Sequence, residues 1–172
     1  YNKKDKKEFD DEFINFINRF DLCIIGGGGF LDYWVPGSQT GATFDIDPSL
    51  VRHIKTPTLF ASMGCNPQKD VPEGNIDKFE RFLSECIDNK KISIALRNDG
   101  SVKAIERDFG AEYLEGIVEI LDHGFFYSPA EPSLKLLNEQ YVAINIVSDQ
   151  LEMRSSLINL GSRNDYKNEL KN

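Results

Sequence analysis

The stretch Asp21-Leu22-Cys23-Ile24-Ile25-Gly26-Gly27-Gly28-Gly29-Phe30 decides the fold, because an apolar run leads directly into four glycines. The branched residues at 22–25 predict a parallel strand buried on both faces, since such strands are continuously apolar. Ligands of open α/β sheets bind where strands end, and glycine lets the backbone approach them closely. The amides of Gly26, Gly27, Gly28 and Gly29 are therefore candidates to border a site for phosphate or carboxylate oxygens. A tight turn without a ligand explains the run equally well.

The residues on either side of this run predict alternating helices and strands. One helix face carries Phe9, Phe13, Phe16, Ile17 and Phe20, and this helix leads into the strand. A short helix at 45–54 begins with Asp47 as N-cap and Pro48 in its first turn. Further strands are predicted at 56–64, 92–96 and 116–122, with helices around 76–87 and 102–109 between them. This alternation is typical of an α/β fold with a parallel sheet.

The second half of the chain changes character after residue 125. Residues 126–140 contain Pro129 and Pro132 and predict a linker, and a fifth apolar run at 141–147 begins a new strand and helix. We therefore expect a first domain at 1–125, a linker at 126–140 and the beginning of a second domain at 141–172. Since the chain starts at Tyr1 inside a predicted helix, we also expect it to be a piece of a longer protein.

The composition limits the classes of function. A net charge of −8 over 172 residues argues against broad binding to nucleic acid or to an anionic membrane, both of which need a basic face. One arginine with a few backbone amides could still hold a small anion. The three cysteines are far apart and predict no disulfide framework, which indicates a reducing compartment such as the cytoplasm. No apolar run is long enough for a transmembrane segment, and no signal peptide is recognisable.

Candidate binding side chains follow several of the predicted strands. Arg97 stands where one strand ends and a helix begins, so it could grip a carboxylate or phosphate, or simply pair with Asp99. Tyr33 and Trp34 follow the glycine run and could stack on a sugar, or could pack within an ordered loop. Asp122 and His123 form an adjacent acid–histidine pair, which is either a catalytic dyad or an ordinary turn.

The order of these motifs resembles that of the polysaccharide pyruvyl transferase family. In that family a strand runs into a glycine-rich loop, a later strand ends in a small-residue turn, and a further strand ends in an Arg-Asp-x-x-Ser-like motif. Here the first two correspond to 21–29 and 56–64, and the third to Arg97-Asn98-Asp99-Gly100-Ser101. The third departs from the family, because Asn98 stands between Arg97 and Asp99. The resemblance covers roughly residues 9–150.

The resemblance implies a two-domain, glycosyltransferase-B-like architecture. Each domain would be Rossmann-like, with a parallel sheet and helices on both of its faces. It implies that the enolpyruvyl carbon of phosphoenolpyruvate is transferred to a saccharide acceptor, free or lipid-linked, to form a pyruvate ketal. The reaction would take place in the cytoplasm or at the inner face of the membrane, without a metal or nucleotide cofactor.

The resemblance also assigns roles to the candidate residues. Arg97 would hold the donor with Ser101 nearby, and the glycine run would border the cleft. Further basic ligands would come from the second domain. Ketal formation requires an acid and a base, for which Asp122, Asp32 and Asp45 are candidates.

Two other functions are consistent with the sequence. One is a nucleotide-sugar-dependent glycosyltransferase of the same architecture. The other is a non-catalytic α/β interaction module, which the altered Arg97-Asn98-Asp99 motif favours.

Overall fold

The computed structural model describes residues 8–67 and 70–128, all of which belong to the first of two units of the chain, Tyr1–Ser128. Four parallel strands form one sheet in the order β1-β2-β3-β4, with the bounds β1 (Cys23–Gly26), β2 (Thr58–Met63), β3 (Ile92–Arg97) and β4 (Ile117–Ile120). These strands confirm the predicted α/β fold with a parallel sheet. The strand predicted at 141–147 and the domain that it begins lie outside the described residues.

The helices alternate with the strands, as predicted. Their bounds are α1 (Asp11–Ile17), α2 (Pro48–Val51), α3 (Asn75–Asp88) and α4 (Ser101–Phe109), with 3-10 turns η2 (Ala111–Leu114) and η3 (His123–Phe126). Asp47 caps α2 by accepting a 2.8 Å hydrogen bond from the Ser49 N–H, so the predicted N-cap is confirmed. The helix predicted around 102–109 is α4, which begins at Ser101 directly after Gly100, a residue in a left-handed conformation with φ of 94°.

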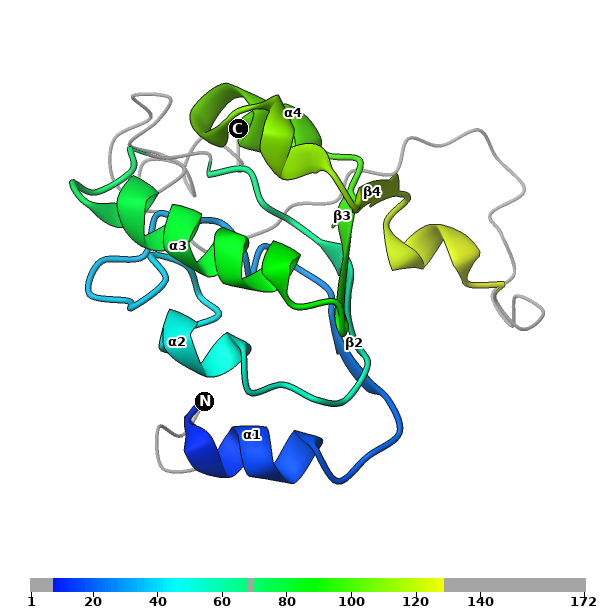
Figure 1. The fold of residues 1–172 in the computed structure, drawn as a ribbon. Helices are drawn as coiled ribbons and strands as arrows, with labels where there is room; N and C mark the ends of the chain where they lie inside the picture. Colours follow the sequence, from blue (N-terminus) through cyan, green and yellow to red (C-terminus); the bar gives the residue numbers. More distant parts are fainter. Residues whose placement is uncertain (1–7, 68–69, 129–172) are drawn as a thin grey trace, which may run out of the picture. The chain divides into compact units, whose positions relative to one another are not determined.

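The strand order places the helices on one side of the sheet. Each strand pairs with the next one in sequence, and right-handed crossovers between such neighbours all fall on the same face. Figure 1 shows α2 and α3 on one side of the strands and η3 (yellow) on the other. The core lies on the helical side, where Phe60 and Ile94 of the sheet meet Phe79, Phe82 and Leu83 of α3.

The opposite face of the sheet carries no helix among the described residues. Ile24 of β1 is 61% exposed there and Val118 of β4 is 56% exposed. The prediction that the first strand is buried on both faces is therefore wrong. The physical reason is that alternate side chains of a strand point to opposite faces, and β1, an edge strand of the described sheet, has no described helix over the face of Ile24 and a neighbouring strand on one side only.

The buried face of the first helix also differs from the prediction. Ile14 and Ile17 are buried, whereas Phe16 and Phe20 are exposed. The helix ends at Ile17, so Phe20 lies beyond it and does not continue the helical periodicity.

Candidate functional site

The carboxyl ends of β1, β2 and β3 come together through two glycines. The Gly64 N–H after β2 donates a 2.8 Å hydrogen bond to the Gly28 carbonyl after β1. A Cβ on Gly64 would lie 3.1 Å from the Gly29 Cα and 2.9 Å from Nη2 of Arg97. Glycine at position 64 therefore allows the glycine run and Arg97 to lie side by side. Gly27 and Gly28 turn the chain at positive φ, 82° and 72°, which glycine adopts without strain.

Arg97, the last residue of β3, lies between two carboxylates. Its Nε and Nη2 contact Asp99 Oδ2 at 2.8 and 2.7 Å, and its Nη1 donates to Asp122 Oδ2 at 3.1 Å. Partial burial opposes the charge on Arg97, but the hydrogen bonds and charges of Asp99 and Asp122 outweigh it and raise the pKa of the guanidinium. The structure thus brings together Arg97, Asp122 and the glycine run, and it also contains the Arg97–Asp99 ion pair that the sequence left as an alternative.

Asp122 is held in its ionised form. The Gly124 N–H donates to its Oδ1 at 2.8 Å, and this bond together with Arg97 lowers the pKa of the carboxyl group. At neutral pH Asp122 can accept a proton but has none to give. Its two oxygens bond Gly124 and Arg97, and the turn that Asp122 caps is the alternative that the sequence left open beside a dyad with His123.

The glycine run offers backbone donors at this end of the sheet. The Gly27 N–H donates to the Ala61 carbonyl at 3.2 Å. The N–H groups of Gly28 and Gly29 have no acceptor among residues 8–67 and 70–128. Two successive amides of this kind suit an anion.

Asp32 and Asp45, the other predicted acids, hold loops in place. Asp32 Oδ1 accepts a 2.7 Å bond from the Asn66 N–H, and a Cβ on Gly29 would overlap Asp32 Oδ2. Asp32 therefore joins the turn after β1 to the loop after β2. Asp45 accepts from the Gln39 N–H at 2.8 Å and so closes the loop that it belongs to.

Two predicted binding residues are buried, and their assignments are corrected. Tyr33 is fully buried, with its ring centroid 4.9 Å from that of Phe79 and 5.1 Å from that of Phe109, so no sugar can stack on it. Trp34 is half-buried beside it. Ser101 is fully buried as well, because its Oγ accepts the Cys65 N–H at 2.7 Å and bonds Asp99. Its hydroxyl ties the end of β2 to the start of α4 and does not face a ligand.

The segment after β4 also belongs to the site, and the sequence predicted only Asp122 and His123 from it. It crosses the carboxyl ends of the neighbouring strands, where the Asn98 N–H donates to the Ile120 carbonyl at 2.9 Å and Ser62 Oγ to the Leu121 carbonyl at 3.3 Å. Farther along, His123 Cε1 lies 3.8 Å from where a Cβ of Gly26 would be. These contacts depend on β4 lying beside β3 in the sheet, which no local sequence pattern specifies.

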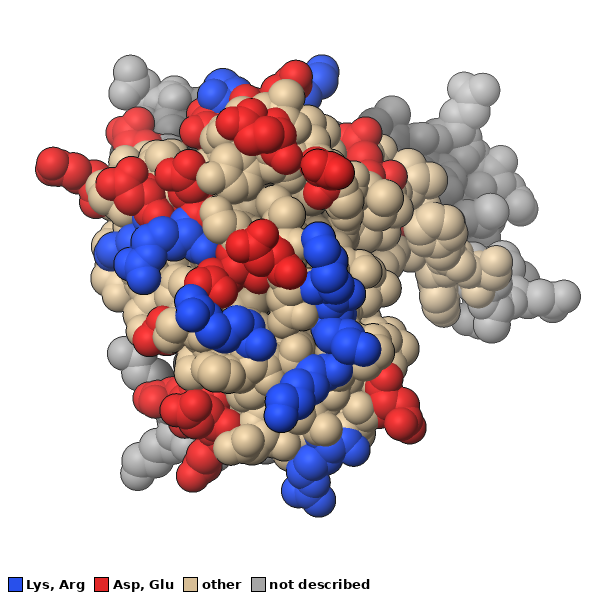
Figure 2. Space-filling model, viewed as in Figure 1, with Lys and Arg blue, Asp and Glu red and all other residues tan. Residues whose placement is uncertain are grey.

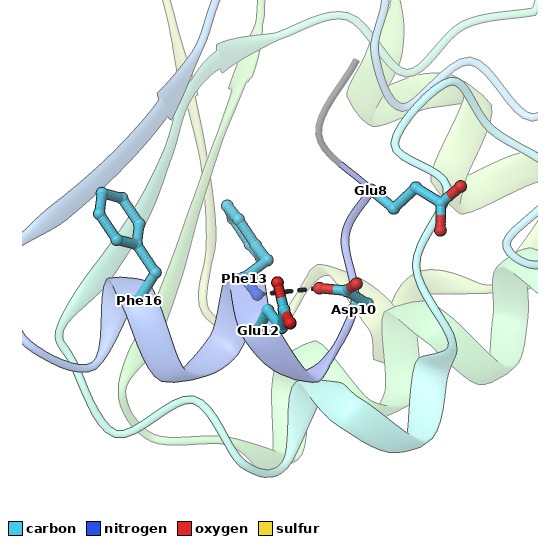
Figure 3. A pocket seen from close by; sticks show the side chains of 5 residues that line it. All are labelled: Glu8, Asp10, Glu12, Phe13 and Phe16. Carbon is cyan, nitrogen blue, oxygen red and sulfur yellow. Dashed lines mark hydrogen bonds between the residues drawn. The ribbon is translucent and has the colours of Figure 1, made fainter. Parts of the chain in front are cut away.

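A hollow at the start of α1 does not suit the same chemistry. Three carboxylates and two phenyl rings line it, from Glu8, Asp10, Glu12, Phe13 and Phe16 (Figure 3). Asp10 already caps the helix through the Phe13 N–H at 2.9 Å. These five residues include no cation to offset the carboxylates, whereas the carboxyl end of the sheet carries Arg97 among its aspartates and is therefore the better candidate for an anion.

Figure 2 shows acidic and basic side chains interspersed over the viewed face. In the described part of the chain, no helix has the length and apolar character needed to cross a bilayer, and no three potential metal ligands cluster. No family model matches the sequence, and no curated protein or solved structure matches it either.

Proposed function

We propose that this chain is the donor-binding part of a transferase that moves a pyruvyl group from phosphoenolpyruvate to a saccharide hydroxyl. The observation that carries the proposal is Arg97 at the carboxyl end of β3, next to Gly64 and the glycine run. A fixed guanidinium beside the amides of Gly28 and Gly29, which have no acceptor in the described part of the chain, suits the carboxylate and phosphate of such a donor.

The donor would enter by displacing one of the two carboxylates from Arg97. The bond from Nη1 to Asp122 is the longer one at 3.1 Å, and the Asp122 side chain is 45% exposed against 30% for Asp99. Exposed ion pairs contribute little free energy, so an incoming anion can replace Asp122. Asp99 keeps its contacts with Nε and Nη2 and continues to orient the guanidinium plane.

The same exchange would prepare Asp122 for proton transfer. Without Arg97 its pKa rises toward the ordinary value, so it becomes a better base for an acceptor hydroxyl. In the full reaction two hydroxyls add to C2 of the donor and its C–O bond to phosphate breaks. One hydroxyl proton ends on the methylene carbon, which becomes methyl, and the other leaves with the phosphate.

Calorimetric titration of phosphoenolpyruvate tests this proposal. We expect binding to the unchanged chain and a loss of at least about tenfold in affinity for Arg97→Ala, as for other charge-assisted contacts. Asp122→Asn should bind the donor at least as tightly as the unchanged chain, because it removes the competing carboxylate, yet it should transfer the pyruvyl group more slowly. Arg52→Ala is the matched control, since Arg52 pairs with Glu85 on an exposed surface.

The pairing of Arg97 with two aspartates also favours a second candidate, the non-catalytic module. Absence of phosphoenolpyruvate binding by folded protein would overturn the transferase proposal in favour of this module. Binding of a nucleotide sugar in its place would indicate the glycosyltransferase.

A further inference from the structure

We propose that Ser62 is a positioning residue of this site, which holds Asp122 against Arg97 through the Leu121 carbonyl. The inference rests on the proposed function, because Asp122 is the carboxylate that the donor would displace and the base that would accept a hydroxyl proton. Ser62 is 1% exposed, so its side chain does not touch a ligand. Its effect on the site therefore passes through its neighbours.

The backbone of Ser62 departs from that of an ordinary strand. Ser62 has a φ of 54° and is the one non-glycine residue with a positive φ among residues 8–67 and 70–128. Glycine adopts this conformation without strain, whereas a residue with a Cβ persists in it only when its surroundings hold it there. Such residues gather at functional sites, and Ser62 lies at the carboxyl end of β2, where the candidate site is.

A β-bulge accounts for the direction of the Ser62 side chain. The register of β2 with β3 shifts between Ala61 and Met63, which leaves Ser62 as an extra residue in the pairing. In a regular strand, alternation would place Ser62 in the core on the same face as Phe60. Here Met63 takes that place, since Phe60 and Met63 both belong to the core. The bulge thus turns the Ser62 hydroxyl toward the segment after β4, as bulges beside active sites commonly do.

The redirected hydroxyl fixes the peptide group that precedes Asp122. Ser62 Oγ donates to the Leu121 carbonyl at 3.3 Å, and this carbonyl shares a peptide plane with the Asp122 N–H. The carbonyl before it, that of Ile120, accepts from the Asn98 N–H at 2.9 Å. Two successive peptide groups are therefore held, one from β2 and one from the residue after β3. The orientation of the second sets the direction in which the Asp122 side chain leaves the backbone.

The two carboxylates of Arg97 depend on this arrangement to different degrees. Asp99 follows Arg97 by two residues, so local geometry brings them together. Asp122 follows it by 25 residues, and its Oδ2 reaches Nη1 of Arg97 at 3.1 Å only because the segment after β4 is held in place. Loss of the Ser62 hydroxyl should therefore loosen the Asp122 contact and leave the Asp99 contact intact.

NMR titration of the Asp122 carboxyl carbon, assigned by its loss in Asp122→Asn, tests this role. The Gly124 N–H and, after it, Arg97 lower the pKa of Asp122. Ser62→Ala should raise this pKa part of the way toward the ordinary value, because it loosens the contact with Arg97 and leaves the Gly124 bond within the turn. Ser62→Gly also lacks the hydroxyl and accepts the positive φ without strain, so it should raise the pKa equally.

Thr58→Val is the matched control, because Thr58 also carries a buried hydroxyl of β2 that donates to a carbonyl, that of Thr56, at 3.0 Å. It should leave the pKa of Asp122 unchanged even if the melting temperature falls. An unchanged pKa in Ser62→Ala, an equal rise in Thr58→Val, or a rise in Ser62→Gly alone would overturn the positioning role. Failure of both Ser62 variants to fold would overturn it too, because the hydroxyl would then serve the whole fold.

Phosphoenolpyruvate binding separates this inference from the proposed function. Ser62→Ala frees Arg97 from the competing Asp122, so it should bind the donor at least as tightly as the unchanged chain. The gain should be at most about fivefold, the range of an exposed ion pair. Weaker binding would overturn the positioning role, since Ser62 would then support Arg97 or the glycine run. Absence of binding to the unchanged chain would overturn the proposed function, whereas the pKa comparison would still decide the role of Ser62.

Discussion

At the scale of single residues, Asn75 shows how one buried amide holds a loop. Its Nδ2 donates to the carbonyls of Tyr33 at 3.2 Å, Val35 at 3.1 Å and Gly41 at 3.2 Å. Asn75→Asp would replace these donors by a carboxylate oxygen that faces three acceptors in a buried position. We expect the free energy of unfolding to fall by roughly 3 kcal/mol or more, measured by urea denaturation.

The control for this change is Asn98→Asp, which makes the same replacement at an exposed position. It should alter the free energy of unfolding by less than about 0.5 kcal/mol. An equal loss in both variants would contradict the role assigned to the Asn75 amide, because the added charge alone would then explain it.

The sequence predicts a residue of the candidate site correctly where that residue directly follows or ends a predicted strand. The position of Arg97 and its pairing with Asp99 needed only local sequence. Its contact with Asp122 depends on β4 lying beside β3, which no local pattern specifies. Ser101 and Tyr33 were misassigned because polar and aromatic residues near a strand end look the same in sequence whether they face a ligand or the core.

At the scale of elements, α2 depends on its first residues. The Asp47 carboxylate accepts a hydrogen bond from the Ser49 N–H. Hydrogen bonds with the backbone and the side chain of Ser49 lower the pKa of this carboxyl group below the ordinary 3.8. Asp47→Ala should destabilise the fold by about 1 kcal/mol at neutral pH. Because the folded-state pKa is the lower one, this contribution is complete above pH of about 4 and is lost as the pH falls through the folded-state value.

Denaturation at pH 7 and at pH 2.5 would measure this dependence. Asp47→Asn should keep most of the cap at both pH values, since the amide oxygen still accepts the bond. Asp21→Ala is the control at an exposed aspartate. If Asp47→Ala cost as much at pH 2.5 as at pH 7, the ionised carboxylate would not be the source of the effect.

The elements themselves follow from the sequence better than their faces do. Each helix and strand predicted between residues 9 and 122 is present. The burial of α1 was predicted incorrectly because five apolar positions suggested a helix longer than the seven residues of Asp11–Ile17. Periodicity predicts which residues would share a face of a helix. Residues beyond the end of the helix, such as Phe20, do not lie on that face.

At the scale of the whole molecule, the strand order explains why the apolar side chains of Ile24 in β1 and Val118 in β4 are exposed. Four neighbouring strands joined in sequence by right-handed crossovers place their helices together. The continuous apolar run at 22–25 suggested burial on both faces, as in most parallel sheets. The register shows instead that Ile25 lies beside the buried Phe60, so that Ile24 faces away from the helices and is exposed.

Substitution of two β-branched residues in the sheet tests this division into faces. Ile24→Thr, on the exposed face, should lower the free energy of unfolding by less than about 0.5 kcal/mol, since it removes little buried surface. Ile94→Thr, on the face that packs against α3, should lower it by roughly 2–4 kcal/mol, because it leaves a cavity and buries a hydroxyl. Both changes retain a residue that favours strands, so strand propensity cancels in the comparison.

Urea denaturation measures the free energy of unfolding of both variants. A loss above about 1 kcal/mol for Ile24→Thr would contradict the exposed face and show that this side of the sheet is covered in the protein.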